Sequence, residues 1–207
     1  MYQKPGWRSD LTGPFAGSNP ALGTIQSKRE DYAQARALYK PRTIRVLFVA
    51  ESPPSSGGFF YFSKTIGKDH LFRETMKALS LWPLGHPLRK GLDKTGLLEE
   101  FRSRGFFLID TCDRPVDRLS PKARRISIAR EAPSLARRAK ELDPGSIVIV
   151  KQTVYGPVRH ELETVGLGNR LLNTGPLPFP SHGNQKRYRL LLRRWIRNVN
   201  HLSRLVI

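Results

Sequence analysis

Two carboxylates directly follow compact apolar runs in this chain of 207 residues. Glu51 comes after the run 44–50, and Asp110 ends the run 105–110. A carboxylate at the end of a buried strand is partly desolvated, which makes it a candidate acid, base or electrostatic stabiliser. The alternatives are a Glu51 that faces water and an Asp110 that caps the next turn. Ser52 adds a hydroxyl beside Glu51, although no nucleophile-elbow pattern surrounds it.

An aromatic run, FFYF at 59–62, follows a pair of glycines; we name residues 57–62 the aromatic loop. Aromatic side chains beside a flexible glycine pair can form a platform on which a flat ring stacks. The alternative is that they pack in the core. Four successive aromatic residues cannot all point inward, so we expect at least one of them to face a ligand or solvent.

The segment LPFPSHGN at 177–184, here named the closing loop, is stiffened by proline and leads into a predicted helix over 185–205. The amino end of a helix presents free N–H groups, which together with the Ser181 hydroxyl can bind a phosphate. His182 is a candidate electrophile or general acid, and the alternative is an ordinary surface histidine. No acidic residue follows Glu163, whereas eight basic residues do: Arg170, Lys186, Arg187, Arg189, Arg193, Arg194, Arg197 and Arg204.

The whole chain is strongly basic, with 36 Lys and Arg against 17 Asp and Glu and a net charge of +19. Such an excess repels itself unless a polyanion screens it, so nucleic acid is the leading partner. An anionic membrane surface is the rival partner. A basic domain that is ribosome-associated, or merely made soluble by its charge, is the remaining alternative.

Cys112 is the single cysteine. It excludes an internal disulfide, a Cys-rich zinc site and an iron–sulfur cluster, so we expect neither a metal nor a cofactor. A reducing cytoplasm fits this composition, with association to the nucleoid if the source is bacterial. The amino terminus has no apolar signal core, and no apolar run approaches the ~18 residues that span a bilayer, so no membrane is expected.

Short apolar runs alternate with helical patterns along the chain. Strands are predicted at 44–50, 105–112, 146–150 and 170–174, and helices at 27–39, 69–81, 121–142, 158–165 and 185–205. This alternation predicts an α/β fold, a three-layer α/β/α sandwich with a four-stranded parallel central sheet. We expect residues 1–42 to form an arm with a short helix, residues 43–207 to form one α/β domain, and the protein to be a monomer. Ligands of such sheets bind at the carboxyl ends of the strands, where the loops 51–62, 110–117 and 176–189 begin.

In this order, the pieces resemble the uracil-DNA glycosylase superfamily over roughly residues 44–197. VLFVAESPP at 46–54 is similar to the family's first motif, which in one branch reads G-E-A-P-G. GFFLID at 105–110, followed by Arg114-Pro115, resembles the second strand, which ends in Asn and leads to Arg-Pro. LDPGSIVIV at 142–150 is similar to the third strand, and LPFPSH at 177–182 resembles the closing motif, usually H-P-S-P.

The resemblance implies a mechanism in which loops rich in Pro and Ser pinch DNA and flip one nucleotide into a pocket. The glycosidic C–N bond then loosens toward a sugar cation and a base anion. By position, Glu51 and His182 are the catalytic candidates. Ser52, Phe60, Tyr61 and Asp110 are the base-binding ones, with Phe60 or Tyr61 as the stacking ring. The residues expected to contact DNA are Pro53, Pro54, Pro180, Ser181, Gly183, Asn184, Lys186, Arg187 and Arg189.

Four positions depart from the family pattern. In the first motif, Ala50 stands in place of the first Gly and Pro54 in place of the last. Asp110 stands in place of the base-reading Asn, and Phe179 in place of the closing His, with His182 three residues further on. The iron–sulfur cysteines that the G-E-A-P-G branch often carries are also missing. An ionised Asp only accepts hydrogen bonds, so it suits an exocyclic amino group better than a carbonyl oxygen, unless it is protonated.

The resulting hypothesis is a DNA glycosylase-like enzyme of base-excision repair that hydrolyses the N-glycosidic bond of uracil or another deaminated base. The first alternative is a catalytically silent protein of the same fold that binds single-stranded DNA or RNA. The second is an unrelated α/β enzyme acting on a free nucleotide or nucleoside, which would not need so basic a carboxyl-terminal segment.

Overall fold

A parallel sheet of three strands forms the centre of the protein. The computed structural model describes residues 31–64, 67–83, 87 and 89–202, with the side chains of 198–202 excepted. The strands are β1 (Val46–Ala50), β2 (Phe106–Asp110) and β3 (Ser146–Ile149), in the order β2-β1-β3. Every residue of β1 and β2 is buried, as expected for parallel strands whose two faces are both covered.

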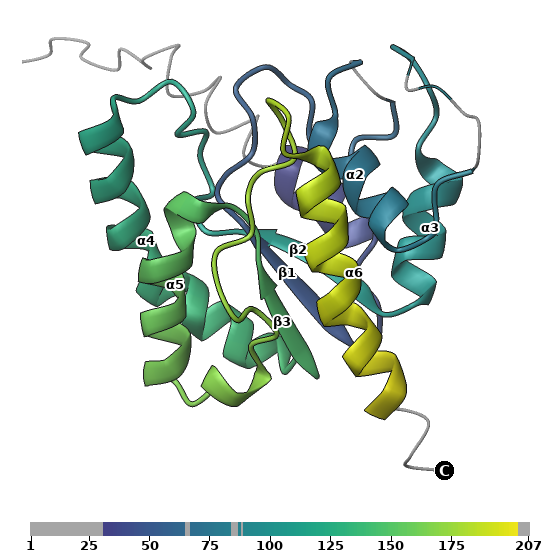
Figure 1. The fold of residues 1–207 in the computed structure, drawn as a ribbon. Helices are drawn as coiled ribbons and strands as arrows, with labels where there is room; N and C mark the ends of the chain where they lie inside the picture. Colours follow the sequence, from purple (N-terminus) through teal and green to yellow (C-terminus); the bar gives the residue numbers. More distant parts are fainter. Residues whose placement is uncertain (1–30, 65–66, 84–86, 88, 203–207) are drawn as a thin grey trace, which may run out of the picture.

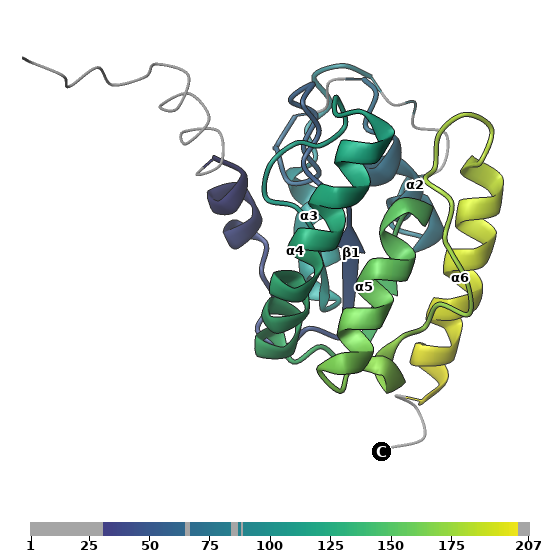
Figure 2. The same ribbon diagram turned by 90° about the vertical axis from the view of Figure 1, so that its left-hand side faces the viewer.

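Helices cover both sides of this sheet (Figures 1 and 2). Helices α4 and α5 lie on one side, and α2, α3 and α6 on the other. The α/β class predicted from the sequence is therefore confirmed. The bounds are α2 (His70–Ala78), α3 (Thr95–Ser103), α4 (Pro121–Leu142), α5 (Gln152–Thr164), the 3₁₀ turn η1 (Gly168–Arg170) and α6 (Gln185–Leu202).

The predicted fourth strand, at 170–174, is wrong. After η1, the chain makes only isolated parallel bridges to β3 and its end, from Leu171 to Ile147 and from Leu177 to Val150. Between them the Asn173 side chain replaces a backbone partner: its Oδ1 accepts from the Ile149 N–H at 2.7 Å and its Nδ2 donates to the Ile149 carbonyl at 3.0 Å. A side-chain amide has the same donor and acceptor as a peptide group, so it can complete this sheet edge without a strand.

A side chain also completes the opposite edge of the sheet. The Tyr61 hydroxyl accepts from the Leu108 N–H at 2.6 Å and donates to the Leu108 carbonyl at 3.1 Å. Tyr61 is fully buried, and burial raises the pKa of its phenol. The aromatic loop is thereby fastened to β2, and unpaired backbone groups at the edge are satisfied.

The helices agree with the sequence in part. Helix α4 has the predicted bounds and continues through Pro133, and the Ser120 hydroxyl caps it by accepting from the Ala123 N–H. Helix α5 begins at Gln152 rather than at 158, and α3 was not predicted because a Pro/Gly-rich stretch precedes it. Among the helices described, none is both long enough and apolar enough to cross a membrane.

The end of the predicted arm, 1–42, belongs to the packed domain. Residues 31–38 are helical, and the Tyr32 ring lies 4.9 Å from that of Phe59, centroid to centroid. Tyr39 stacks on Tyr61 at 5.9 Å. The rest of the arm, including the predicted helical residues 27–30, lies outside the described residues.

Candidate active site

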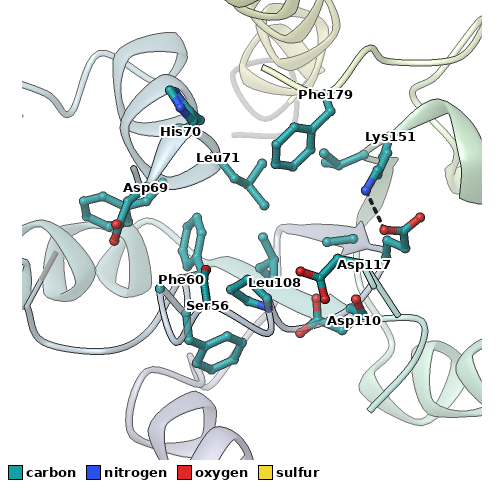
Figure 3. A pocket seen from close by; sticks show the side chains of 18 of the residues that line it. Ser56, Phe60, Asp69, His70, Leu71, Leu108, Asp110, Asp117, Lys151 and Phe179 are labelled. Carbon is teal, nitrogen blue, oxygen red and sulfur yellow. Dashed lines mark hydrogen bonds and ion pairs between the residues drawn. The ribbon is translucent and has the colours of Figure 1, made fainter. Parts of the chain in front are cut away.

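A pocket of about 280 Å³ opens at the carboxyl edge of the sheet (Figure 3). All three loops expected to leave that edge contribute to its walls. Its volume is close to the ~300 Å³ at the lower end of small-molecule sites. The lining residues used below are Glu51, Ser52, Pro54, Phe60, Lys68, Asp110, Asp117, Lys151 and Phe179.

Phe60 provides an aromatic wall of the pocket. It packs edge-on against Phe72, with ring centroids 5.3 Å apart, and is only 5% exposed. Of the two stacking candidates, Phe60 lines the pocket and Tyr61 points away from it to the edge of β2. Tyr61 is therefore not placed to contact a bound base, because its buried hydroxyl is bonded to the edge of β2. Phe179 from the closing loop supplies a second aromatic face.

Glu51 is buried, and donors fill its four acceptor positions. Oε1 accepts from Arg124 Nε at 2.8 Å and from Thr153 Oγ1 at 2.6 Å. Oε2 accepts from Lys151 Nζ at 2.5 Å and from a second Arg124 nitrogen. Since a carboxylate has about four lone-pair positions, no acceptor position is left with which Glu51 could deprotonate a water.

The electrostatics keep Glu51 ionised. Burial alone would raise its pKa, but the hydrogen bonds from Arg124, Lys151 and Thr153 outweigh burial and hold the pKa of Glu51 below its usual range. Arg124 belongs to α4 and Thr153 to α5, so this one carboxylate connects the end of β1 to both helices on that side of the sheet.

Lys151 is the functional residue that the sequence reasoning missed. It precedes α5 with φ 90° and ψ 132°, a conformation that non-glycine residues rarely adopt. Its Nζ lies 5.1 Å from the centre of the Phe179 ring. Burial lowers the pKa of Lys151, although Glu51 opposes this effect. The sequence does contain a pattern that indicates Lys151, because this residue follows the apolar run of β3 just as Glu51 follows that of β1.

Asp110 is the second buried carboxyl of the pocket. Arg36, from the helical segment 31–38, donates to its Oδ2 at 2.8 Å. Burial raises the pKa of Asp110 to about 6, and Arg36 limits the rise. Oδ1 accepts no hydrogen bond from any residue that the structure describes. It is thus available to a ligand, and near neutral pH the group can change between acceptor and donor.

Short contacts tie the walls of the pocket to one another. Asp117 accepts from the Ser55 hydroxyl at 2.7 Å and from the Ser55 N–H at 3.2 Å. The Ser52 hydroxyl accepts from the Val116 N–H at 3.3 Å. Ser52 lines the pocket, and its hydroxyl joins the loop after β1 to the loop after β2.

Phe179 is the only residue of the closing loop that lines the pocket. None of the predicted site residues of this loop does: Pro180, Ser181, His182, Gly183 and Asn184. Pro180 is buried, whereas His182 and Gly183 are exposed. His182 adopts φ 49°, and its Nδ1 lies 2.9 Å from the Ser181 hydroxyl. The structure therefore does not bring His182 together with Glu51, because the turn at 181–184 directs the histidine to the surface.

The predicted DNA-contacting residues divide into exposed and committed groups. Pro54 lines the pocket, while Pro53 is buried. Lys186 and Arg187 are exposed on the first turn of α6. Arg189 instead forms an ion pair with the buried Glu74 of α2. Asn184 starts α6 from a half-exposed position, and its carbonyl accepts from the Tyr188 N–H.

Neither a scan against models of known protein families nor a search of curated proteins finds a match to this chain. In the described part of the chain, no three His, Cys, Asp or Glu side chains gather in a way that could hold a metal ion. The chemistry open to the pocket therefore depends on carboxyl groups such as Glu51 and Asp110, on the half-buried Lys151 and on the aromatic walls.

Proposed function

We propose that the protein binds one base, extruded from a DNA strand, in this pocket and hydrolyses the N-glycosidic bond of that base. The observation that carries the proposal is that Glu51, Phe60, Asp110 and Phe179 all line one pocket. These residues come from three separate loops, and each has a role in removing a flat base from its sugar.

The pocket can hold and read an aromatic ring. Phe60 and Phe179 offer two faces for stacking, each such contact contributing about 1–3 kcal/mol. Asp110 offers an unused oxygen to the hydrogen-bonding edge of the base. When ionised it accepts from an amino or ring N–H group, and when protonated it donates to a carbonyl oxygen, as a deaminated base presents.

The charged residues suit the separation of charge as the bond breaks. A sugar cation beside Glu51 is stabilised by a carboxylate that stays ionised. The Lys151 ammonium uses one N–H on Glu51, which leaves two N–H groups that can stabilise the departing base anion. Because all of these groups are held by the fold, they need little reorganisation during the reaction.

Exposed basic residues next to the closing loop support DNA as the partner. Lys186 and Arg187 are exposed where the closing loop enters α6, and the chain carries a net charge of +19. Phosphates on either side of an extruded nucleotide would contact such residues, whereas base recognition would take place inside the pocket.

Base release tests the proposal. Purified protein is incubated with labelled oligonucleotides that contain uracil, hypoxanthine or xanthine, and alkali then cleaves any abasic site. We expect cleavage of at least one of them, and its loss in Glu51→Gln. Glu100→Gln, which removes an exposed partner of Arg104, is the matched control and should retain activity. Absence of cleavage with every substrate would reject the enzyme.

A silent nucleic-acid-binding protein is the second candidate, and the filled acceptor positions of Glu51 favour it. An enzyme that depends on a carboxylate to activate water would leave one oxygen accessible. Tight, salt-sensitive binding of single-stranded DNA or RNA by a protein that releases no base would identify this alternative.

A further inference from the structure

Lys151 combines three features that neither candidate function requires together. Its half-buried side chain lines the pocket, its ammonium contacts a carboxylate at 2.5 Å, and its backbone is held at φ 90°. Strained backbone conformations persist where surrounding structure enforces them, often at functional positions. Here the strain places a primary amine in the wall of the pocket.

We propose that Lys151 is a nucleophile that captures the C1′ aldehyde of an abasic deoxyribose as a Schiff base, giving the protein an abasic-site lyase activity. This inference rests on the proposed function, because it places an abasic nucleotide in the pocket. It goes beyond it, since hydrolysis of a glycosidic bond needs no covalent intermediate.

The position of the amine relative to Glu51 carries the inference. Any sugar whose developing cation is stabilised by Glu51 has C1′ next to that carboxylate, and Lys151 Nζ is 2.5 Å from Oε2 of the same group. The amine is thus within a few ångströms of the carbon that becomes electrophilic. Glu51 cannot itself supply activated water while its acceptor positions are filled, and the Lys151 amine is the nucleophile in direct contact with that carboxylate.

The chemistry balances without an additional reactant. The neutral amine adds to the C1′ aldehyde of the opened sugar to form a carbinolamine. The carbinolamine takes up a proton from solvent and loses water, which gives a protonated imine. Loss of a C2′ proton to water forms the C2′–C3′ double bond and breaks the C3′–O bond, so that the 3′ phosphate leaves. Water then hydrolyses the imine and returns the lysine.

The charges around Lys151 set the pH at which it can react. Burial and Arg124 lower the pKa of Lys151, whereas Glu51 and Asp117 raise it. The net effect is a pKa below that of an ordinary lysine, so more neutral amine is present at a given pH. Because the neutral amine is required, capture should increase as the pH is raised toward the pKa of Lys151.

Borohydride trapping on preformed abasic DNA tests the inference separately from base release. The full-length protein is mixed with an abasic oligonucleotide and sodium borohydride, and the reduced covalent complex is digested and mapped. We expect a complex attached at Lys151, and strand cleavage without alkali. In Lys151→Arg, which retains the charge facing Glu51, trapping should fall by about tenfold or more.

Lys140→Arg is the matched control, because Lys140 is an exposed lysine of α4 that does not line the pocket, and it should trap like the wild type. Circular dichroism and binding of the same oligonucleotide check that the variants fold. Failure of the wild type to form a complex, or attachment at Lys68 or the terminal amine, would overturn the inference. Base release without a trapped complex would support the glycosylase and contradict the lyase. A trapped complex without base release would support the lyase and contradict the glycosylase.

Discussion

The Arg36 guanidinium donates to Oδ2 of Asp110 at 2.8 Å, so a residue that precedes the sheet sets the charge at the end of its second strand. The contact joins positions 74 residues apart in the chain. It connects the helical segment 31–38 to the pocket, because Arg36 opposes the rise that burial causes in the pKa of Asp110.

Replacing Arg36 by Gln should raise the pKa of Asp110 further above its present value of about 6. The reason is that burial already favours the protonated carboxyl, and Arg36 is the main group that opposes it. Carbon-13 NMR of the aspartate carboxyls, followed against pH, measures the change. Arg125→Gln, on the exposed surface of α4, removes the same charge and should leave this titration unmoved.

Asp110 should also shape how stability depends on pH. Its pKa rises from 3.8 to about 6 on folding, so the folded state binds the proton more tightly. Asp110 therefore stabilises the folded protein by about 3 kcal/mol below about pH 4, and this contribution is lost as the pH rises to about 6. Urea denaturation should show this loss in the wild type and not in Asp110→Asn. Parallel pH profiles for the two proteins would contradict the assignment.

Glu51→Gln should reduce the free energy of unfolding by about 3 kcal/mol, because it leaves Lys151 and Arg124 without their buried counter-ion. Because the pKa of Glu51 is lowered on folding, stability depends on the pH in the opposite direction from that for Asp110. The stabilisation from Glu51 is present at neutral pH and is lost as the pH falls through the pKa of Glu51 in the folded state. Denaturant titration at pH 7 measures the effect. The control Glu100→Gln breaks an ion pair whose side chains are nearly half exposed, and should cost under about 1 kcal/mol.

Phe179→Ala should weaken base binding with little loss of stability, since this ring is only half-buried and faces the pocket. One stacking face is worth about 1–3 kcal/mol, which corresponds to roughly 5- to 150-fold in affinity. Fluorescence anisotropy should record the loss for an oligonucleotide with the target base, but not for one with an abasic analogue. The control Leu190→Ala truncates a side chain that is 69% exposed on α6; equal losses in both variants would argue against stacking.

Lys186→Gln combined with Arg187→Gln should weaken DNA binding at low salt and reduce the slope of log affinity against log salt by about two. Both side chains are exposed at the start of α6, where phosphates would lie. Arg189→Gln serves as the comparison, because Arg189 already neutralises Glu74. It should lower stability more than the salt slope, and an equal change of slope would show that Arg189 also contacts phosphate.

The sequence allowed the three strands and the placement of Glu51 and Asp110 to be predicted, because continuous apolar runs and the residues that end them are local signals. It could not predict Tyr61 and Asn173 as partners of β2 and β3. In both contacts a side chain takes the place of a neighbouring strand. No local sequence pattern distinguishes Tyr61 or Asn173 from an ordinary core or loop residue.

The composition of the site depended on contacts between distant segments. Arg124 was visible only as one of many basic residues in a helix, and nothing nearby in the sequence indicates its bond to Glu51, 73 positions away. His182 shows the converse. It follows the motif position by three residues in the sequence, but it lies exposed in a turn with a positive φ of 49°.

The side chains at the two sheet edges connect the pocket to the slow dynamics of the core. Tyr61 belongs to the aromatic loop that forms one wall, and Asn173 precedes the loop that forms another. The amide hydrogens of Leu108 and Ile149 therefore cannot exchange with solvent deuterium unless the segment carrying the corresponding wall first detaches. The exchange rates of these two buried backbone amides, on a timescale of minutes to hours, thus report how often each wall of the pocket opens.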